Sequence, residues 1–305
     1  MRTGAWGPGA LLALGLAACT PAPPPAARYT PGTPWQGEKG VWFYPTEAFP
    51  LRETGLAAVA APGHPPRTAD GEAYDPEAMA AAHQTLPLPA VLRVTNLENG
   101  RSALVRVNDR GPADPGRVLE LTPGAARRLG IPAAGGTRVA LAVAEAESRA
   151  LALATGAPAP EAAPVPAGAV QQRDLPPPAG IGVSARAHAL HPQAAPAGPA
   201  LPDLPAVPDL PAVPGRLPPE VTEGPPAPGR LLLEAGRFSQ PGFAQARLRR
   251  LGLPEARVVR WREGRADTYG VEAGPYPDAG AADAALDRAI AAGIPDAKIV
   301  VEQGR

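Results

Sequence analysis

The sequence is poor in aromatic side chains, which make up 4% of its 305 residues, and its 29 basic and 29 acidic side chains cancel. Zero net charge gives no reason to expect a nucleic acid or an acidic membrane surface as partner. Beyond the amino terminus no stretch is apolar for long enough to span a bilayer. Metal-ligand spacing, a phosphate-cradling glycine loop and a serine or cysteine triad are all missing from the sequence. We therefore predict neither a metal nor another cofactor.

The single cysteine, Cys19, closes an export signal. Residues 1–18 carry a positive charge at Arg2 and a short apolar core at 10–17. Residues 16–19 (LAAC) resemble the bacterial lipoprotein processing box, in which the cysteine becomes the first residue and carries the lipid. The alternative is a free thiol beside an ordinary cleavage site. Thr20 stands where an acid would favour the inner membrane, so the resemblance implies anchoring in the outer membrane, facing the periplasm.

Two segments are rich in proline, which accounts for 44 residues of the chain. Residues 19–53 are predicted to be a tether whose aromatic patch, VWFY at 41–44, packs as a small strand on the next domain. Residues 147–229 are predicted to be a disordered Pro/Ala-rich linker, in which PDLPAV occurs at Pro202 and again at Pro208. Such a segment favours polyproline II and would act as a long spacer.

Residues 54–146 show the pattern of a small closed β-barrel. Two β-rich runs, residues 91–97 and 102–108, flank Asn99 and Gly100, and Asn-Gly between such runs is a strong hairpin signal. We predict short helices at residues 76–83 and 123–129, the second ended by Gly130, and a last strand at 137–144. Short strands with turn signals and little helix favour a barrel.

Residues 230–305 repeat themselves. EAG at 234–236 recurs at 272–274, and LGLPEARVV at 251–259 recurs as AGIPDAKIV at 292–300. Each half has the pattern strand, helix, strand. This predicts a four-stranded antiparallel sheet with two helices on one face, the ferredoxin-like β-α-β-β-α-β plan. The other face of the sheet is then free to bind a ligand.

Four motifs in the first domain carry a family resemblance. They are TADGE at residues 68–72, AAHQTLP at 81–87, RVTN at 93–96 and VNDRGP at 107–112. In order and spacing they resemble the rare lipoprotein A family, whose fold is a six-stranded double-psi β-barrel. The last domain resembles a SPOR domain, the peptidoglycan-binding module that ends many members. Members usually open the barrel with G-x-ASWYG, and residues 55–59 here (GLAAV) lack the Trp-Tyr pair.

The resemblance implies a lytic transglycosylase, or a glycan binder that has lost that activity. The reaction cuts the bond between N-acetylmuramic acid and N-acetylglucosamine without water, because the sugar's own 6-hydroxyl attacks and leaves an anhydro end. One group is enough: it protonates the leaving oxygen and then takes the proton from the hydroxyl. Such a group needs a pKa raised towards neutrality.

Asp109 is the predicted proton-shuttling acid, although NDRG is also the composition of an Asx turn. Glu72 is either its partner carboxyl or a solvated loop acid. His83 is implied to bond a carboxylate or a sugar hydroxyl; the alternative is a capping or core histidine. Arg110 either binds the lactyl carboxylate of the substrate or forms an internal salt bridge.

In the last domain, Phe238 and Tyr276 match aromatic positions of SPOR domains. Glycan stripped of its peptides exposes sugar faces for stacking and lactyl carboxylates for arginine. Trp261, with Arg237 and Arg260, is predicted to serve that recognition.

The predicted protein is a lipid-anchored lytic transglycosylase of the cell envelope that acts on peptide-poor glycan strands during wall remodelling and septation, with division-site proteins as candidate partners. The alternative is a non-catalytic lipoprotein of the same build that tethers the outer membrane to denuded septal glycan. The catalytic prediction requires Asp109 to lie in a cleft and to be free of a tight ion pair.

Overall fold

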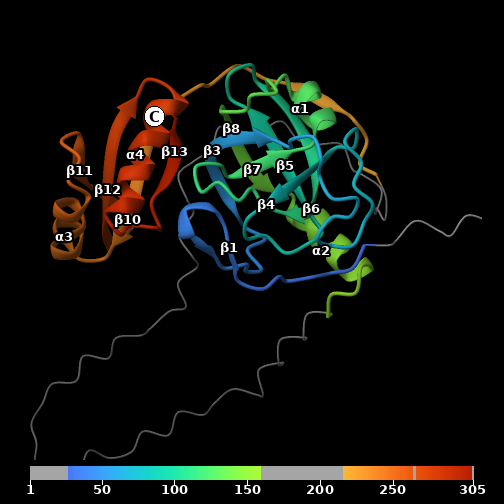
Figure 1. Ribbon diagram of the computed structural model, residues 1–305, viewed down its shortest axis with the longest axis horizontal. Helices are drawn as coiled ribbons and strands as arrows, with labels where there is room; N and C mark the ends of the chain where they lie inside the picture. The colour runs from blue at the N-terminus through green and yellow to red at the C-terminus, as the bar shows by residue number, and fades with distance from the viewer. Residues whose placement is uncertain (1–26, 159–215, 264–265, 304–305) are drawn as a thin grey trace, which may run out of the picture.

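The computed structural model describes residues 27–158, 216–263 and 266–303 (Figure 1). The export signal, the lipidation site at Cys19 and the PDLPAV repeats lie outside these residues. Within the described ranges, no helix has both the length and the apolar character that a membrane crossing requires.

Six strands form a closed barrel. Along the sheet they follow the order β4-β7-β3-β8-β5-β6, and a further pairing of β4 with β6 closes the ring. The pairs β3–β7 and β4–β6 are parallel and the other pairs are antiparallel. The strands are β3 (Arg52–Val59), β4 (Ala80–His83), β5 (Ala90–Asn96), β6 (Arg101–Arg110), β7 (Leu119–Leu121) and β8 (Thr137–Val143). This confirms the predicted double-psi β-barrel.

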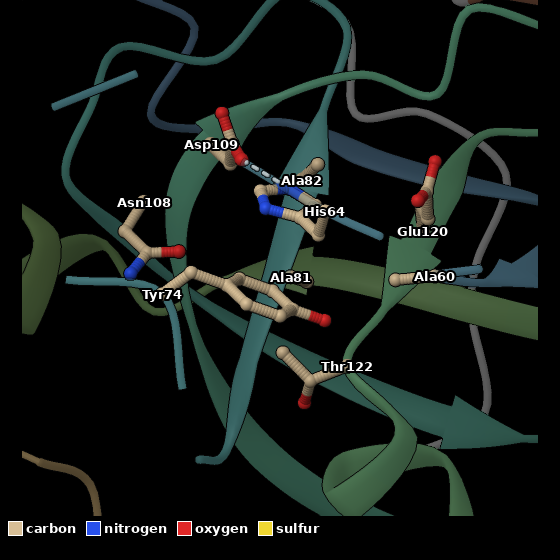
Figure 2. Close-up of a pocket in the computed structure, with 9 residues that line it drawn as sticks. All are labelled: Ala60, His64, Tyr74, Ala81, Ala82, Asn108, Asp109, Glu120 and Thr122. Carbon is tan, nitrogen blue, oxygen red and sulfur yellow. Dashed lines mark ion pairs between the residues drawn. The ribbon is translucent and has the colours of Figure 1, made fainter. Parts of the chain in front are cut away.

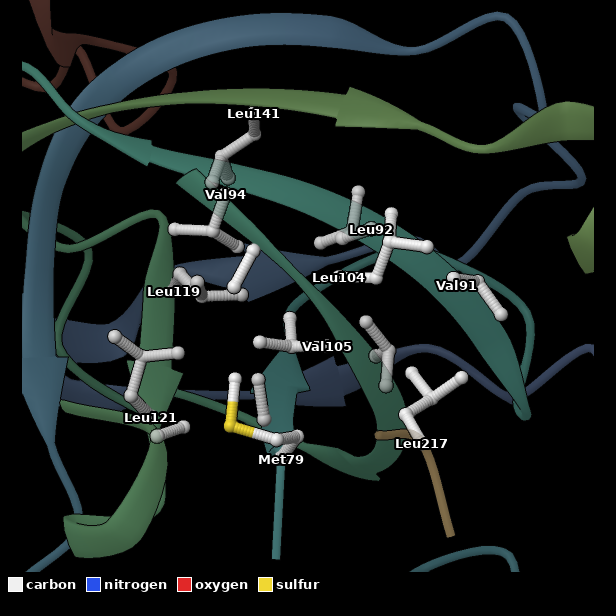
Figure 3. Packing of buried hydrophobic residues seen from close by; sticks show 14 of the residues in the cluster. Met79, Val91, Leu92, Val94, Leu104, Val105, Leu119, Leu121, Leu141 and Leu217 are labelled. Carbon is white, nitrogen blue, oxygen red and sulfur yellow. The ribbon is translucent and has the colours of Figure 1, made fainter. Parts of the chain in front are cut away.

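The interior of the barrel is filled by aliphatic side chains from alternate strand positions. Leu92, Val105, Leu119 and Leu121 are fully buried and meet at its centre (Figure 3). Each such leucine stabilises the fold by about 2 kcal/mol when it leaves water. The hairpin of β5 and β6 turns where the sequence predicts it, at Gly100, which adopts the positive φ of 77° that glycine allows.

The helix predicted at residues 76–83 is wrong. Residues 80–83 form β4, which pairs with β6 on one side and β7 on the other. Alanine favours a helix locally, but two rows of backbone hydrogen bonds and a buried position outweigh that preference. The helix at 123–129 is confirmed as α1 (Pro123–Leu129), which Thr122 caps and Gly130 ends with φ 69°.

Residues 27–53 pack against the barrel as a hook. It contains β1 (Trp35–Gln36), a 3₁₀ turn (Glu38–Gly40) and β2 (Trp42–Phe43). The ring of Trp35 lies 4.8 Å from that of Phe43, and its indole N–H donates to the carbonyl oxygen of Gln84. The aromatic patch is thus a small strand held on the barrel, as predicted.

The segment predicted as a disordered linker has ordered ends. Residues 145–154 form α2 (Glu145–Ala154), which packs on β5. Near the other end, β9 (Val221–Glu223) pairs with β6, and Leu217 is buried in the barrel core (Figure 3). The prediction is wrong at both ends, because pairing with the barrel supplies the apolar contacts that this composition lacks by itself; residues 159–215 lie outside the described ranges.

The last domain has the predicted β-α-β-β-α-β order. Its sheet runs β11-β12-β10-β13 with every pair antiparallel, and both helices contribute to a single core with the sheet. The elements are β10 (Arg230–Phe238), α3 (Pro241–Leu251), β11 (Ala256–Glu263), β12 (Ala266–Tyr276), α4 (Ala279–Ala291) and β13 (Lys298–Glu302). The structure therefore confirms the fold that the repeat in the sequence predicted.

The two domains are in direct contact along β13 and β3 (Figure 1). The Thr54 hydroxyl donates to the carbonyl oxygen of Val301 at 2.8 Å and accepts its N–H at 3.0 Å. Arg117 forms two hydrogen bonds with Asp283 on α4, at 2.7 and 2.9 Å. Three apolar side chains of the barrel belong to the core of the last domain: Leu56, Leu97 and Ala140.

Candidate active site

A pocket opens where β4, β6 and β7 end. It is lined by small and polar side chains: Ala60, His64, Tyr74, Ala81, Ala82, Asn108, Asp109, Glu120 and Thr122 (Figure 2). Two carboxyl groups and an imidazole face it from different parts of the chain. Asp109 comes from β6, Glu120 from β7, and His64 from the loop between β3 and β4. Elsewhere among the described residues, as here, no group of three or more His, Cys, Asp or Glu is arranged to hold a metal ion.

Both oxygens of the Asp109 carboxylate have close polar partners. Oδ1 accepts the backbone N–H of Ala69 at 2.9 Å and that of Arg110 at 2.7 Å. Oδ2 lies 2.8 Å from Nε2 of His64, and the two side chains are 16% and 18% exposed. Asp109 therefore meets one requirement of the catalytic prediction, because it lies in a pocket, and fails the other, because it forms a close pair with His64.

His64 is fixed on both sides. Its ring stacks on Tyr74 with centroids 3.8 Å apart and planes 13° from parallel. Nδ1 lies 2.8 Å from the carbonyl oxygen of Pro65, while Nε2 faces Asp109. Both ring nitrogens thus face oxygen atoms. The loop places an imidazole of fixed orientation at the rim of the pocket.

Glu120 is the second carboxylate of the pocket. Burial raises its pKa, His64 partly offsets that effect, and the negative charge of Asp109 adds to it. Ala82 of β4 stands directly opposite both Glu120 on β7 and Asp109 on β6. Because residues opposite one another project to the same face of a sheet, the two carboxyls flank the methyl group of Ala82.

Glu72, a predicted catalytic residue, does not line the pocket. Its carboxylate accepts two hydrogen bonds from Arg106, at 2.7 and 3.2 Å, and one from Asn108 at 2.8 Å. These bonds fasten the loop at 68–72 to β6. Since the same loop supplies the Ala69 N–H to Asp109, Glu72 holds the frame of the pocket in place.

His83 and Arg110 lie away from the pocket. Nδ1 of His83 accepts the backbone N–H groups of Thr85 and Leu86, and Nε2 donates to Glu53 at 2.8 Å. The Arg110 guanidinium donates to the carbonyl oxygens of His83 and Leu86, and its burial lowers its pKa. Both side chains are used inside the protein to shape the turn after β4.

The predicted glycan-binding residues of the last domain divide between two environments. Trp261 packs against Gly270 on the neighbouring strand, and the guanidinium of Arg237 lies over its ring. Phe238 instead packs on the core beneath Arg247 of α3. Tyr276 also contacts that core, and its hydroxyl donates to Glu255. The structure does not bring these three rings together.

Reasoning from sequence missed His64, Tyr74 and Glu120. The two loop residues precede and follow the TADGE motif, and the carboxylate sits in a strand of only three residues. A usable signal was the alternation of Leu119, Glu120 and Leu121, in which one acid interrupts two apolar residues of a buried strand.

Residues 53–141 match the family described as lytic transglycolase. Identity is 51% over 88 residues to a probable endolytic peptidoglycan transglycosylase RlpA of Synechocystis sp., covering 28% of this chain and 27% of the relative. The barrel belongs to the rare lipoprotein A family. Other members are the endolytic peptidoglycan transglycosylases RlpA of Pseudomonas aeruginosa, 48% identical over 102 residues (33% of this chain, 30% of the relative), and Yersinia pestis, 61% over 64 residues (21% and 18%). The matched part thus spans less than a third of each relative.

This rare lipoprotein A barrel differs from the usual pattern at β3. The G-x-ASWYG segment places its Trp-Tyr pair at Val59 and Ala60, and Ala60 lines the pocket. A small side chain therefore stands at the pocket wall where members usually carry an aromatic ring. The stacked pair of His64 and Tyr74 supplies the aromatic surface of this pocket.

Proposed function

We propose that this protein is a lytic transglycosylase that cleaves peptidoglycan between N-acetylmuramic acid and N-acetylglucosamine and leaves 1,6-anhydro-muramyl ends. One observation carries the proposal. In a barrel of the rare lipoprotein A family, two carboxyl groups and a histidine from three separate segments face one pocket. The names of the relatives, all peptidoglycan transglycosylases, support the same substrate.

The pocket fits an intramolecular reaction better than hydrolysis by a nucleophile. An ordinary retaining glycosidase needs one carboxyl to attack the sugar and a second to protonate the leaving group. Asp109 is held by backbone N–H groups and by His64, so its oxygens are not free to attack carbon. When the substrate's own hydroxyl attacks, the protein does not have to supply a nucleophile. Its side chains then only have to transfer a proton.

The last domain is proposed to act as a SPOR domain that binds glycan strands lacking stem peptides. The proposal rests on its fold and on Trp261, which carries a stacked arginine on the sheet. With lipidation at Cys19, the protein would be anchored in the outer membrane, face the periplasm and gather at the division septum. A full-length Trp261→Ala variant should lose septal enrichment while it stays in the envelope; unchanged placement would refute this role.

The enzymatic proposal is tested with peptide-stripped sacculi. Purified full-length protein is incubated with them, and the soluble products are analysed by mass spectrometry. Fragments with anhydro-muramyl ends that disappear with Asp109→Asn support the enzyme. Binding without release would support the non-catalytic tether, which the small side chain of Ala60 at the pocket favours.

A further inference from the structure

Two carboxylates flank the same pocket floor, and they differ in what they contact. Asp109 and Glu120 stand one strand to either side of Ala82. Because neighbouring strands lie about 4.8 Å apart, their Cα atoms are separated by roughly 10 Å. On the sheet only the methyl group of Ala82 separates them, and in the view of Figure 2 the ring of His64 lies between the two carboxyls, at the wall of the pocket.

Asp109 is poorly suited to give up or take a proton. Two backbone N–H groups share Oδ1, and His64 occupies Oδ2. Partners within the protein therefore face both oxygens of this carboxylate. The residue that the sequence motif highlights is thus used to fix the loop at 68–72 and the imidazole of His64.

Glu120 has the opposite surroundings. In the part of the chain that the structure describes, no group donates a hydrogen bond to its carboxylate. Burial raises its pKa; His64 partly offsets that effect, and the negative charge of Asp109 adds to it. A carboxyl that is half-buried, unpartnered and next to a fixed anion has the properties of a general acid.

We propose that Glu120 is the catalytic acid and base of the reaction, and that Asp109 is a positioning residue that holds His64 beside it. This inference rests on the function proposed above. Protonated Glu120 donates its proton to the glycosidic oxygen as the bond from the muramyl C1 to that oxygen breaks. The resulting carboxylate takes the proton of the muramyl 6-hydroxyl as its oxygen bonds to C1. Glu120 ends protonated, and no water or other reactant is consumed.

The test compares four full-length proteins on peptide-stripped sacculi: wild type, Glu120→Gln, Glu120→Asp and the control Glu145→Gln. Glu145 is an exposed acid on α2 that pairs with Arg149 one turn further along the helix, far in sequence from the residues of the pocket, so its loss should leave the rate unchanged. Glu120→Gln should lower the release of anhydro-muramyl fragments at least 100-fold without weakening glycan binding. Its melting temperature at neutral pH should equal or exceed that of the wild type, because the buried charge is removed.

The pH profile separates a proton donor from a residue that only shapes the pocket. Wild-type release should fall as the pH rises through the pKa of Glu120, and Glu120→Asp should shift the midpoint of that fall. A Glu120→Gln protein that is folded and as active as the wild type would overturn the assignment while the proposed function stands. A wild type that releases no anhydro-muramyl fragments would overturn both.

Discussion

The described part of the protein contains two histidine–carboxylate pairs of the same length in very different surroundings. Nε2 of His64 lies 2.8 Å from Asp109, and Nε2 of His83 lies 2.8 Å from Glu53. In the second pair the other ring nitrogen is saturated by two backbone N–H groups and the imidazole side chain is 3% exposed. The first pair lines a pocket beside Glu120. Contact geometry alone therefore does not distinguish the two pairs; the catalytic role proposed for the first rests on the open space and the unpartnered acid next to it.

The largest expected difference between the pairs is in activity. Asp109→Asn removes the charge opposite His64 and should reduce fragment release at least 100-fold, which corresponds to about 2.7 kcal/mol of transition-state stabilisation. Glu53→Gln retains an acceptor for Nε2 of His83 and should reduce release less than threefold. The rate of fragment release per folded molecule, measured for both variants in parallel, checks both expectations. Equal losses in the two variants would contradict the difference between the two pairs.

The second expected difference is in stability. His83→Ala leaves the N–H groups of Thr85 and Leu86 without their acceptor and should lower the free energy of unfolding by about 2–4 kcal/mol. His64→Ala, at the rim of the pocket, should cost less than about 1 kcal/mol. Urea denaturation of the two variants provides the measurement, and a larger loss for His64→Ala would contradict the contrast.

The loop that supports Asp109 carries a pH-dependent cost. Asp70 is buried, its Oδ2 has no hydrogen-bond partner among the described residues, and burial, with Glu72, raises its pKa to about 6. A carboxyl whose folded-state pKa is raised binds its proton more tightly when folded, so stability is lost as the pH rises from about 4 through 6. The loss at pH 7 is at most roughly 3 kcal/mol.

Asp70→Asn should therefore stabilise the protein at pH 7.5 and have little effect at pH 4. Oδ1, which accepts from Thr68 and from the Glu72 N–H, is retained in asparagine. Unfolding free energies at the two pH values test this. A gain of the same size at both would show that Asp70 does not titrate as its burial implies.

The smallest expected effect is at the contact between the domains. Thr54→Val removes the hydroxyl that serves both backbone groups of Val301 and should cost about 1 kcal/mol. Thr46→Val, which leaves its own backbone bond to Thr85 in place, is a matched control in the hook. Hydrogen exchange at Val301 should rise only in the first variant, and unchanged exchange there would place the docking energy elsewhere.

Local signals in the sequence were sufficient for much of the fold. Asn99 and Gly100 turn the hairpin, Gly130 ends α1, and the internal repeat lays out the whole last domain. The prediction for residues 80–83 was wrong because pairing with the neighbouring strands β6 and β7, rather than local sequence, determines that they form a strand. The four family motifs pointed to the correct barrel.

The pocket could be predicted only in part. Asp109 was found because a motif contains it. Glu120 reaches the same place through the register of β4 with both β6 and β7, which no local pattern encodes. Glu72 and His83 were placed in the chemistry by their motifs, whereas in the structure hydrogen bonds within the protein occupy both. Their catalytic assignment stays a prediction.

The contact between the two domains at Thr54 has a practical consequence for experiments on the separate domains. Gly55 has no side chain there, and a Cβ atom would lie 2.5 Å from Val118 and 3.3 Å from the carbonyl oxygen of Ile299, so the backbones meet at close range. Cutting the chain near residue 229 would bare Leu56 and Leu97 on one fragment and the outer edge of β13 on the other. Exposed hydrophobic patches and unpaired strand edges both promote aggregation. Activity and binding measured on the separate domains would then differ from those of the full-length protein. Single substitutions in the full-length protein avoid this problem.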